Sequence, residues 1–275
     1  MKSKTVQKLL LIIRCITFLP AIIKKKLFKP KTIYCNLVIF DMDGTFTTTH
    51  TFKQALTNLY KDNGETYEKV IFTQNNKKGF TVDNQRMLDG LKYLTDGQFK
   101  IDDEKSLEEK AIKNVSPAIK KMLKKIPVNV ETIIITKSSD HIAKKLAKRF
   151  GLSNGYGSIM EYDKKRILKT ARLLVTDNVP NLKTKIKLVT KETLARKHME
   201  KKRMVFDLNK TIFVGNDALD LELMVKCVFS ILVKKEKSEF IDSLVYYLTP
   251  YDFILSESSN SFNSLEKILN TKIRF

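Results

Sequence analysis

The 275-residue sequence predicts an α/β protein with a mainly parallel sheet and helices on both of its faces. Short, continuous apolar runs typical of buried strands lie at 37–40, 133–135 and 212–214. Segments with apolar residues at every third or fourth position lie between them, as in amphipathic helices. With 43% apolar residues, the chain is long enough to bury one sizeable core and a second small unit.

The first half of the chain begins with a predicted strand over 33–40, which ends at Asp41. Helices are predicted from residue 51 and over 83–95, 105–115 and 116–126. The last of these has Ser116 as a helix cap and Pro117 at its first position, where the missing N–H costs nothing. Pro127 ends it, because proline cannot continue a helix.

The second half begins with a strand over 130–136, which ends at Thr136, and a helix over 140–150, which stops at Gly151. Residues 154–188 are ambiguous and fit short strands. The remaining predicted elements are a helix over 191–205, a strand over 211–215, a helix from 219, strands at 228–233 and 251–255, and a helix around 265–269.

The N-terminal segment 1–31 combines a short apolar stretch, 9–23, with lysines on both sides. Fifteen residues fall short of the roughly 20 that cross a bilayer as a helix. The pattern indicates either a helix lying on an anionic membrane surface or an extra helix packed on the protein. We therefore expect a cytoplasmic protein, with peripheral membrane attachment as one of two equal alternatives.

The formal net charge of +21 suits polyanionic partners, but most of the excess is lysine spread along the whole chain. Surfaces that bind nucleic acid usually cluster their charge and favour arginine, so nucleic acid is not the expected partner. The three cysteines and three histidines are dispersed, which argues against a zinc site or a disulfide framework and for a reducing compartment.

Chemistry-bearing residues follow the predicted strands directly, where parallel sheets bind ligands. Asp41 and Asp43 follow the first strand, Thr136 ends the second, and Asp217 and Asp220 follow the third. Paired carboxylates can divide nucleophilic and acid–base work, and Mg²⁺ binds hard oxygen ligands. Gly44 permits a tight turn whose amide N–H groups face a phosphate. These ingredients, with a lysine, predict a Mg²⁺-assisted phosphoryl-transfer site.

Four ordered motifs resemble those of the haloacid-dehalogenase (HAD) superfamily: "FDMDGTF" (40–46), "IIITKS" (133–138), a lysine that opens a helix, and "FVGNDALDLELM" (213–224). The resemblance implies a Rossmann-like, doubly wound core. It implies that Asp41 is the nucleophile, which forms an aspartyl-phosphate, and that Asp43 is the acid–base. Thr136 and the lysine would bind the phosphoryl group.

The resemblance also implies Mg²⁺ between Asp41, the Asp43 carbonyl and the last motif. There the family usually has aspartate after the glycine, and this chain has Asn216. The direct ligand is therefore Asn216 or Asp217, with Asp220 in support. Lys191 fits the phosphate-binding lysine best because it opens the helix before the third strand, and Lys187 and Lys197 are the fallbacks.

The spacing of 95 residues from Asp41 to Thr136 leaves room for a small helical cap, as in the phosphoserine-phosphatase-like branch. The expected domains are a catalytic core over 32–46 and 115–275 and a helical cap over 47–114. Phosphoserine phosphatases hold the substrate amine with acidic residues just after the first motif. This chain has "TFTTTHTF" there, so phosphoserine is not the expected substrate.

The sequence thus predicts a Mg²⁺-dependent phosphatase that acts on a small phosphorylated substrate. Three alternatives stay open: a HAD-shaped binding or scaffold protein impaired at Asn216, a phosphatase for a membrane-linked phosphate ester, and one for a nucleic-acid-linked ester. The sequence indicates neither the oligomeric state nor whether water or another acceptor takes the phosphoryl group.

Overall fold

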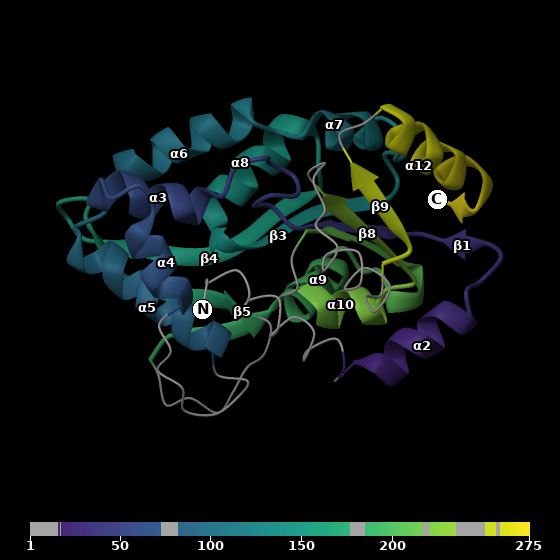
Figure 1. Cartoon of the computed structure of the whole chain (residues 1–275), viewed down its shortest axis with the longest axis horizontal. Helices are drawn as coiled ribbons and strands as arrows, with labels where there is room; N and C mark the ends of the chain where they lie inside the picture. Colours follow the sequence, from purple (N-terminus) through teal and green to yellow (C-terminus); the bar gives the residue numbers. More distant parts are fainter. Residues whose placement is uncertain are drawn as a thin grey trace. The chain divides into compact units, whose positions relative to one another are not determined.

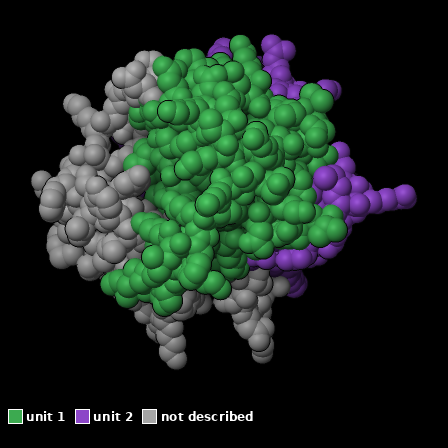
Figure 2. All heavy atoms as spheres, turned by 90° about the vertical axis from the view of Figure 1, so that its right-hand side faces the viewer, with its two compact units in different colours: residues 1–45, 116–132, 205–275 green, residues 46–115, 133–204 purple. Residues whose placement is uncertain are grey.

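The computed structural model describes residues 16, 18–72, 82–176, 185–216, 220–234, 251–256 and 259–275. The chain forms two compact units (Figure 2). The first unit comprises residues 1–45, 116–132 and 205–275, and the second comprises 46–115 and 133–204. The fold class is α/β with mostly parallel strands, as predicted.

The first unit is built on four parallel strands in the order β2, β7, β8, β9. They are β2 (Leu37–Phe40), β7 (Thr211–Gly215), β8 (Phe229–Lys234) and β9 (Phe253–Ser256). Every residue of β2 and β7 is buried, which is why these strands appear in the sequence as continuous apolar runs. The first predicted strand, 33–40, is interrupted: its start, β1 (Ile33–Tyr34), pairs instead with β10 (Ile273–Arg274).

Helices cover both faces of these strands (Figure 1). The helices α7 (Pro117–Leu123) and α12 (Ser259–Thr271) lie on one side, and α2 (Leu19–Leu27) and α10 (Leu221–Lys226) lie on the other. A single 3₁₀ turn, η2 (Leu208–Lys210), leads into β7. Ser116 and Pro117 begin α7 as predicted, although the Ser116 side chain makes no capping hydrogen bond. The helix ends at Leu123, three residues before its predicted end at 126.

Residues 9–15 and 17 of the N-terminal apolar segment lie outside the described residues, and the described part of the segment contains the start of helix α2. This helix packs on the first unit through Ile22, which is 1% exposed, and through the Lys25 ammonium. That ammonium donates to the Met224 carbonyl (2.6 Å) and to Ser230 Oγ (2.8 Å) and pairs with Asp252 (3.0 Å). Within the described ranges, no helix has both the length and the apolar character needed to span a bilayer. Attachment to a membrane surface stays a prediction.

The second unit contains the strands β3 (Glu131–Ser139), β4 (Asn154–Tyr162), β5 (Leu168–Thr176) and β6 (Lys187–Thr190). The chain enters this unit within β3. The pairs β3–β4 and β5–β6 are parallel, whereas β4 and β5 are antiparallel neighbours. The ambiguous stretch 154–188 therefore consists largely of two nine-residue strands rather than several short ones.

The helices of the second unit are α3 (Thr51–Tyr60), α4 (Glu65–Phe72), α5 (Val82–Asp96), α6 (Ile101–Lys113), α8 (Asp140–Phe150) and α9 (Lys191–Lys201). All except α4 were predicted, although α6 begins four residues earlier than the predicted range of 105–115, and α9 ends four residues earlier than expected. Helix α8 ends at Gly151, whose φ of +71° places it in the left-handed region that favours glycine at a helix end.

Two glycines of β4 let this strand lie directly against the main chain of its neighbours. A Cβ added to Gly155 would come within 2.1 Å of the Ala143 carbonyl oxygen in α8. One added to Gly157 would come within 2.5 Å of the Ser138 carbonyl oxygen. Since both obstacles are main-chain atoms, a side chain at either position would force the strand away from β3 and α8.

The predicted cap begins at residue 47 and ends at residue 114. The first stretch of the second unit covers residues 46–115, so both predicted boundaries lie within one residue of those of this stretch. Two further changes of unit, at 132/133 and 204/205, were not predicted. They place the four cap helices in the same compact unit as β3 to β6. The assignment of 47–114 as a functional cap stays a prediction.

Candidate active site

Asp41, Asp43 and Gly44 follow β2 in the first unit, as the sequence predicts. The Asp41 amide donates to the Val214 carbonyl at 2.8 Å, which fixes the start of this loop against β7. The Asp41 side chain is buried, at 8% exposed, whereas Asp43 is half-buried. Gly44 has a φ of +79°, a conformation that glycine adopts without strain, and the turn closes with a hydrogen bond from the Thr45 amide to the Met42 carbonyl (3.3 Å).

The last motif reaches the same edge of the same unit. Because β2 and β7 are parallel and Phe40 lies beside Val214, Asp41 and Gly215 follow at neighbouring strand ends. The Asp220 carboxylate is buried and lies against Gly215: a Cβ added there would be 2.7 Å from Asp220 Oδ2. The structure therefore brings Asp41, Asn216 and Asp220 to one edge. Asp217 lies outside the described residues.

The oxygen atoms at this edge are of the kind that Mg²⁺ prefers. They include the buried Asp41 carboxylate and the Asn216 amide oxygen, beside the main-chain carbonyls of the loop that carries Asp43. In the part of the chain that the structure describes, no three His, Cys, Asp or Glu side chains are grouped so as to hold a metal ion. A donor set of this kind fits Mg²⁺, which commonly uses one or two carboxylates and completes its shell with water and phosphate oxygens.

Thr136 belongs to the second unit, where β3 becomes irregular between Ile135 and Ser139. Its side chain is buried, and Oγ1 accepts a hydrogen bond from the Ser138 amide at 3.1 Å. Ser139 then caps α8: its Oγ accepts from the amides of His141 (3.1 Å) and Ile142 (3.4 Å). These local bonds hold the segment between the strand and the helix in a defined conformation.

Lys191, also in the second unit, is the first residue of α9, directly after β6. Thr190 caps the helix, and its Oγ1 accepts from the Thr193 amide at 3.1 Å. Lys191 is buried, at 5% exposed, whereas the fallback lysines Lys187 and Lys197 are exposed. Lysine is almost never buried in proteins unless its charge is paired. Of the three candidate lysines, Lys191 is therefore the one whose position indicates a specific role.

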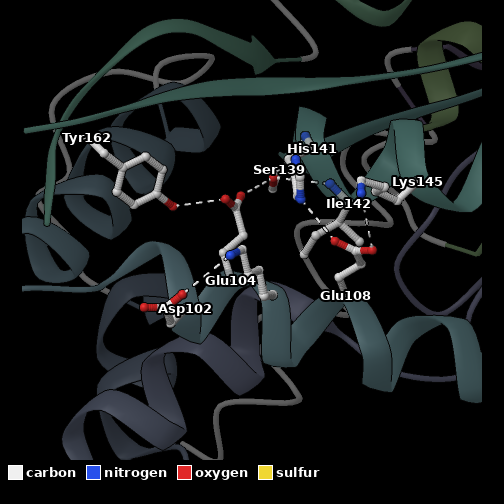
Figure 3. A network of polar contacts seen from close by, with 9 residues as sticks. Asp102, Glu104, Glu108, Ser139, His141, Ile142, Lys145 and Tyr162 are labelled. Carbon is white, nitrogen blue, oxygen red and sulfur yellow. Dashed lines mark hydrogen bonds and ion pairs between the residues drawn. The ribbon is translucent and has the colours of Figure 1, made fainter. Parts of the chain in front are cut away.

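Sequence reasoning did not identify Glu104 of α6, which is buried in the second unit, at 5% exposed. Its carboxylate accepts from the hydroxyls of Ser139 and Tyr162, the latter at 3.1 Å (Figure 3). Burial, and next the Glu104 charge, raise the pKa of the Tyr162 hydroxyl above its ordinary value. The only signal in the sequence is one acid among several on a charged helix, which does not distinguish Glu104 from its neighbours.

Comparison with known proteins finds a family model whose matched range contains all of the candidate site residues. A family model described as haloacid dehalogenase-like hydrolase matches residues 38–225. The matched range contains every candidate catalytic, phosphate-binding and metal-binding residue, from Asp41 to Asp220. No significant match is found among curated protein sequences.

Several solved structures share the fold at low sequence identity. A phospho-aspartyl intermediate analogue of phosphoserine phosphatase has a TM-score of 0.57 and 17% identity, and the match covers 86% of this chain and 98% of that one. A substrate-bound phosphoserine phosphatase has a TM-score of 0.57 and 16% identity, with 86% and 97% covered. A phosphoserine phosphohydrolase-like protein from Francisella tularensis subsp. tularensis SCHU S4 has a TM-score of 0.57 and 14% identity, with 84% and 99% covered.

Proposed function

The chain belongs to the haloacid dehalogenase-like hydrolase family, and we propose that it is a Mg²⁺-dependent phosphatase that hydrolyses a small phosphomonoester through an aspartyl-phosphate. One observation carries the proposal. Asp41 and Asp43 follow a fully buried strand and lie at the edge to which β7 brings Asn216 and Asp220. A structural role alone does not explain a buried carboxylate and a second, more accessible one in the same loop.

The proposed reaction has two steps in which Asp41 and Asp43 have different roles. In the first, an Asp41 carboxylate oxygen attacks phosphorus, and the bond to the ester oxygen breaks as that oxygen takes a proton from Asp43. In the second, Asp43 takes a proton from water while the water oxygen attacks phosphorus. The bond to Asp41 then breaks, which releases inorganic phosphate and restores both carboxyl groups.

The remaining candidates bind the phosphoryl group in this proposal. Gly44 allows main-chain N–H groups of its turn to face phosphate oxygens, and the Thr136 hydroxyl donates to another. The Lys191 ammonium supplies positive charge, and its buried position favours a fixed geometry. The Asp41 carboxylate, the Asp43 main-chain carbonyl and Asn216 or Asp217 would hold Mg²⁺, with Asp220 behind them. When bound, the ion neutralises charge on the phosphoryl oxygens.

Hydrolysis of a generic aryl phosphate tests the proposal. We expect turnover with Mg²⁺ and its loss in excess EDTA, with recovery when Mg²⁺ is added back, because two anions must otherwise approach each other. Turnover that persists unchanged in EDTA would contradict the metal requirement. Absence of turnover on a broad panel of phosphomonoesters would favour the alternative of a HAD-shaped binding protein.

A further inference from the structure

We propose that a pocket of the second unit binds the leaving group of the substrate and that Glu104 selects an ammonium group there. The substrate class is then the phosphomonoester of an amino alcohol, with or without N-methyl groups. This inference rests on the proposed function, because it takes Thr136 as the ligand of the phosphoryl group. Every residue used below belongs to the second unit.

The pocket is mainly apolar and opens to solvent, and the empty space within its outline, open solvent included, is about 370 Å³. Its apolar lining comes from α3, α5, α6, α8, β4 and β5 and from Phe99, which lies between α5 and α6; it includes Phe52, Leu107, Ile142 and Met160. The polar lining residues are Thr51, Glu104, Ser138 and Ser139. An apolar pocket with few polar groups is typical of a small-molecule site in which those groups fix the orientation of the ligand.

The pocket lies next to the proposed phosphate ligand. Ser138 lines the pocket, and its amide donates to Thr136 Oγ1 at 3.1 Å. Two residues of chain span about 7 Å at most. A phosphomonoester whose phosphoryl group is bound by Thr136 therefore has its leaving group within reach of the pocket.

Glu104 is the only acidic residue of this lining, and its described partners are both neutral. Ser139 and Tyr162 each donate one hydroxyl to it, one to each carboxylate oxygen (Figure 3). A carboxylate has about four acceptor positions, so about two remain. Buried charges are usually paired, and in apolar surroundings an added cation interacts strongly with such a carboxylate. A ligand ammonium supplies the missing charge, and the lining also contains Phe52 and Phe99, a residue type whose ring face can attract a cation.

The lining also indicates which ligands are disfavoured. None of the residues that line the pocket is a lysine, arginine or histidine. A carboxylate or a second phosphate on the leaving group would thus meet Glu104 without a cation to pair with. We therefore expect amino alcohol phosphates to be better substrates than the phosphate esters of amino acids or of hydroxy acids.

The test compares kcat/KM for 2-aminoethyl phosphate and n-propyl phosphate, which differ by an ammonium in place of a methyl group, with serine O-phosphate as a third substrate. The wild-type enzyme should prefer 2-aminoethyl phosphate over both others at least tenfold. In Glu104→Gln the ratio of 2-aminoethyl to n-propyl phosphate should fall at least tenfold. A wild-type enzyme without this preference, or a ratio unchanged in Glu104→Gln, overturns the inference.

Two further variants distinguish recognition of the ammonium by Glu104 from a purely structural role of Glu104. Glu108→Gln changes the next glutamate on the same face of α6, which pairs with His141 (2.9 Å) and Lys145 (4.0 Å) outside the pocket, and it should keep the wild-type ratio (Figure 3). Tyr162→Phe removes one partner of Glu104 but keeps the carboxylate, so it should also keep the ratio. If Tyr162→Phe lowers the ratio as much as Glu104→Gln does, Glu104 has a structural role and the inference fails.

Hydrolysis of aryl phosphate distinguishes a failure of this inference from a failure of the proposed phosphatase function. If the wild type hydrolyses neither aryl phosphate nor any ester of the panel, the phosphatase proposal fails, and binding then decides the inference. Calorimetric titration with 2-aminoethyl phosphate should show at least tenfold weaker binding to Glu104→Gln than to the wild type. Equal affinities, or no binding to the wild type, would overturn it.

Discussion

The Asp41→Asn variant is expected to lose about 10³-fold or more of the phosphatase activity, because an amide cannot replace the carboxylate that attacks phosphorus. The substitution keeps the shape of the side chain, and Asp41 lies at the end of a strand that is buried throughout. The loss should therefore appear in kcat while the thermal unfolding midpoint changes little. Initial rates with aryl phosphate and Mg²⁺, together with a melting curve, measure both.

Asp43→Asn is the matched comparison for this variant, since it removes the proton donor two residues along the same loop. It should also be strongly impaired, most of all in breakdown of the intermediate, where water must lose a proton. Substantial activity in Asp41→Asn would show that phosphorus is attacked directly by water. In that case Asp41 binds metal or substrate and is not the nucleophile.

The Asp252→Asn variant is expected to destabilise the protein by about 3–5 kcal/mol, the usual effect of leaving one charge of a buried pair uncompensated. Lys25 and Asp252 are 9% and 3% exposed in their side chains and lie 3.0 Å apart. Asparagine can still accept the hydrogen bond from the Ser230 amide (2.9 Å), so the change mainly removes charge. Chemical denaturation at pH 7 measures the loss.

Substitutions of the two lysines that pair with Asp252 should have smaller effects on stability than Asp252→Asn. Lys25→Met should cost less than Asp252→Asn, because Asp252 keeps its pair with Lys29 at 3.0 Å. Lys29, about half exposed, should contribute roughly 0–1 kcal/mol when replaced by Met. Equal and small effects of all three substitutions would contradict the assignment of Lys25–Asp252 as the contact that fixes α2.

The same pair predicts a dependence of stability on pH. Burial lowers the pKa of the Lys25 ammonium, and the Asp252 charge partly offsets this. Between the lowered pKa and the ordinary value of 10.5, the folded protein binds fewer protons than the unfolded chain, so this group makes stability rise with pH. Since Asp252→Asn removes the offsetting charge, its destabilisation should be largest near pH 7 and should shrink as the pH approaches 10.5.

The sequence predicts those parts of the fold in which the local pattern of apolar residues matches the residues that are buried in the structure. The strands β2 and β7 are buried along their whole length, so they appear as unbroken apolar runs. Their polar termini, Asp41 and Asn216, then follow from the rule that parallel strands bind ligands at their carboxyl ends. Helix α7 begins after the predicted cap, Ser116, and helix α8 ends at the predicted glycine, Gly151.

What was missed depends on contacts between distant parts of the sequence. The strand β4 contains Gly155 and Gly157, which usually weaken a strand but here allow contact with the main chain of α8 and of Ser138. Glu104 resembles any other acid of α6 until folding brings Ser139 and Tyr162 to its carboxylate. Likewise, nothing local in the sequence distinguishes Lys25, whose partner Asp252 lies 227 residues further along the chain.

Detection of the phosphorylated residue tests the central claim most directly. The Asp43→Asn enzyme is mixed with aryl phosphate and Mg²⁺, quenched in acid, and digested, and the phosphorylated peptide is sequenced by mass spectrometry. We predict one phosphoryl group on Asp41, removed by neutral hydroxylamine as an acyl phosphate should be, and absent from a double variant that also carries Asp41→Asn. A phosphoryl group on another residue, or its absence while wild-type turnover proceeds, would contradict the mechanism.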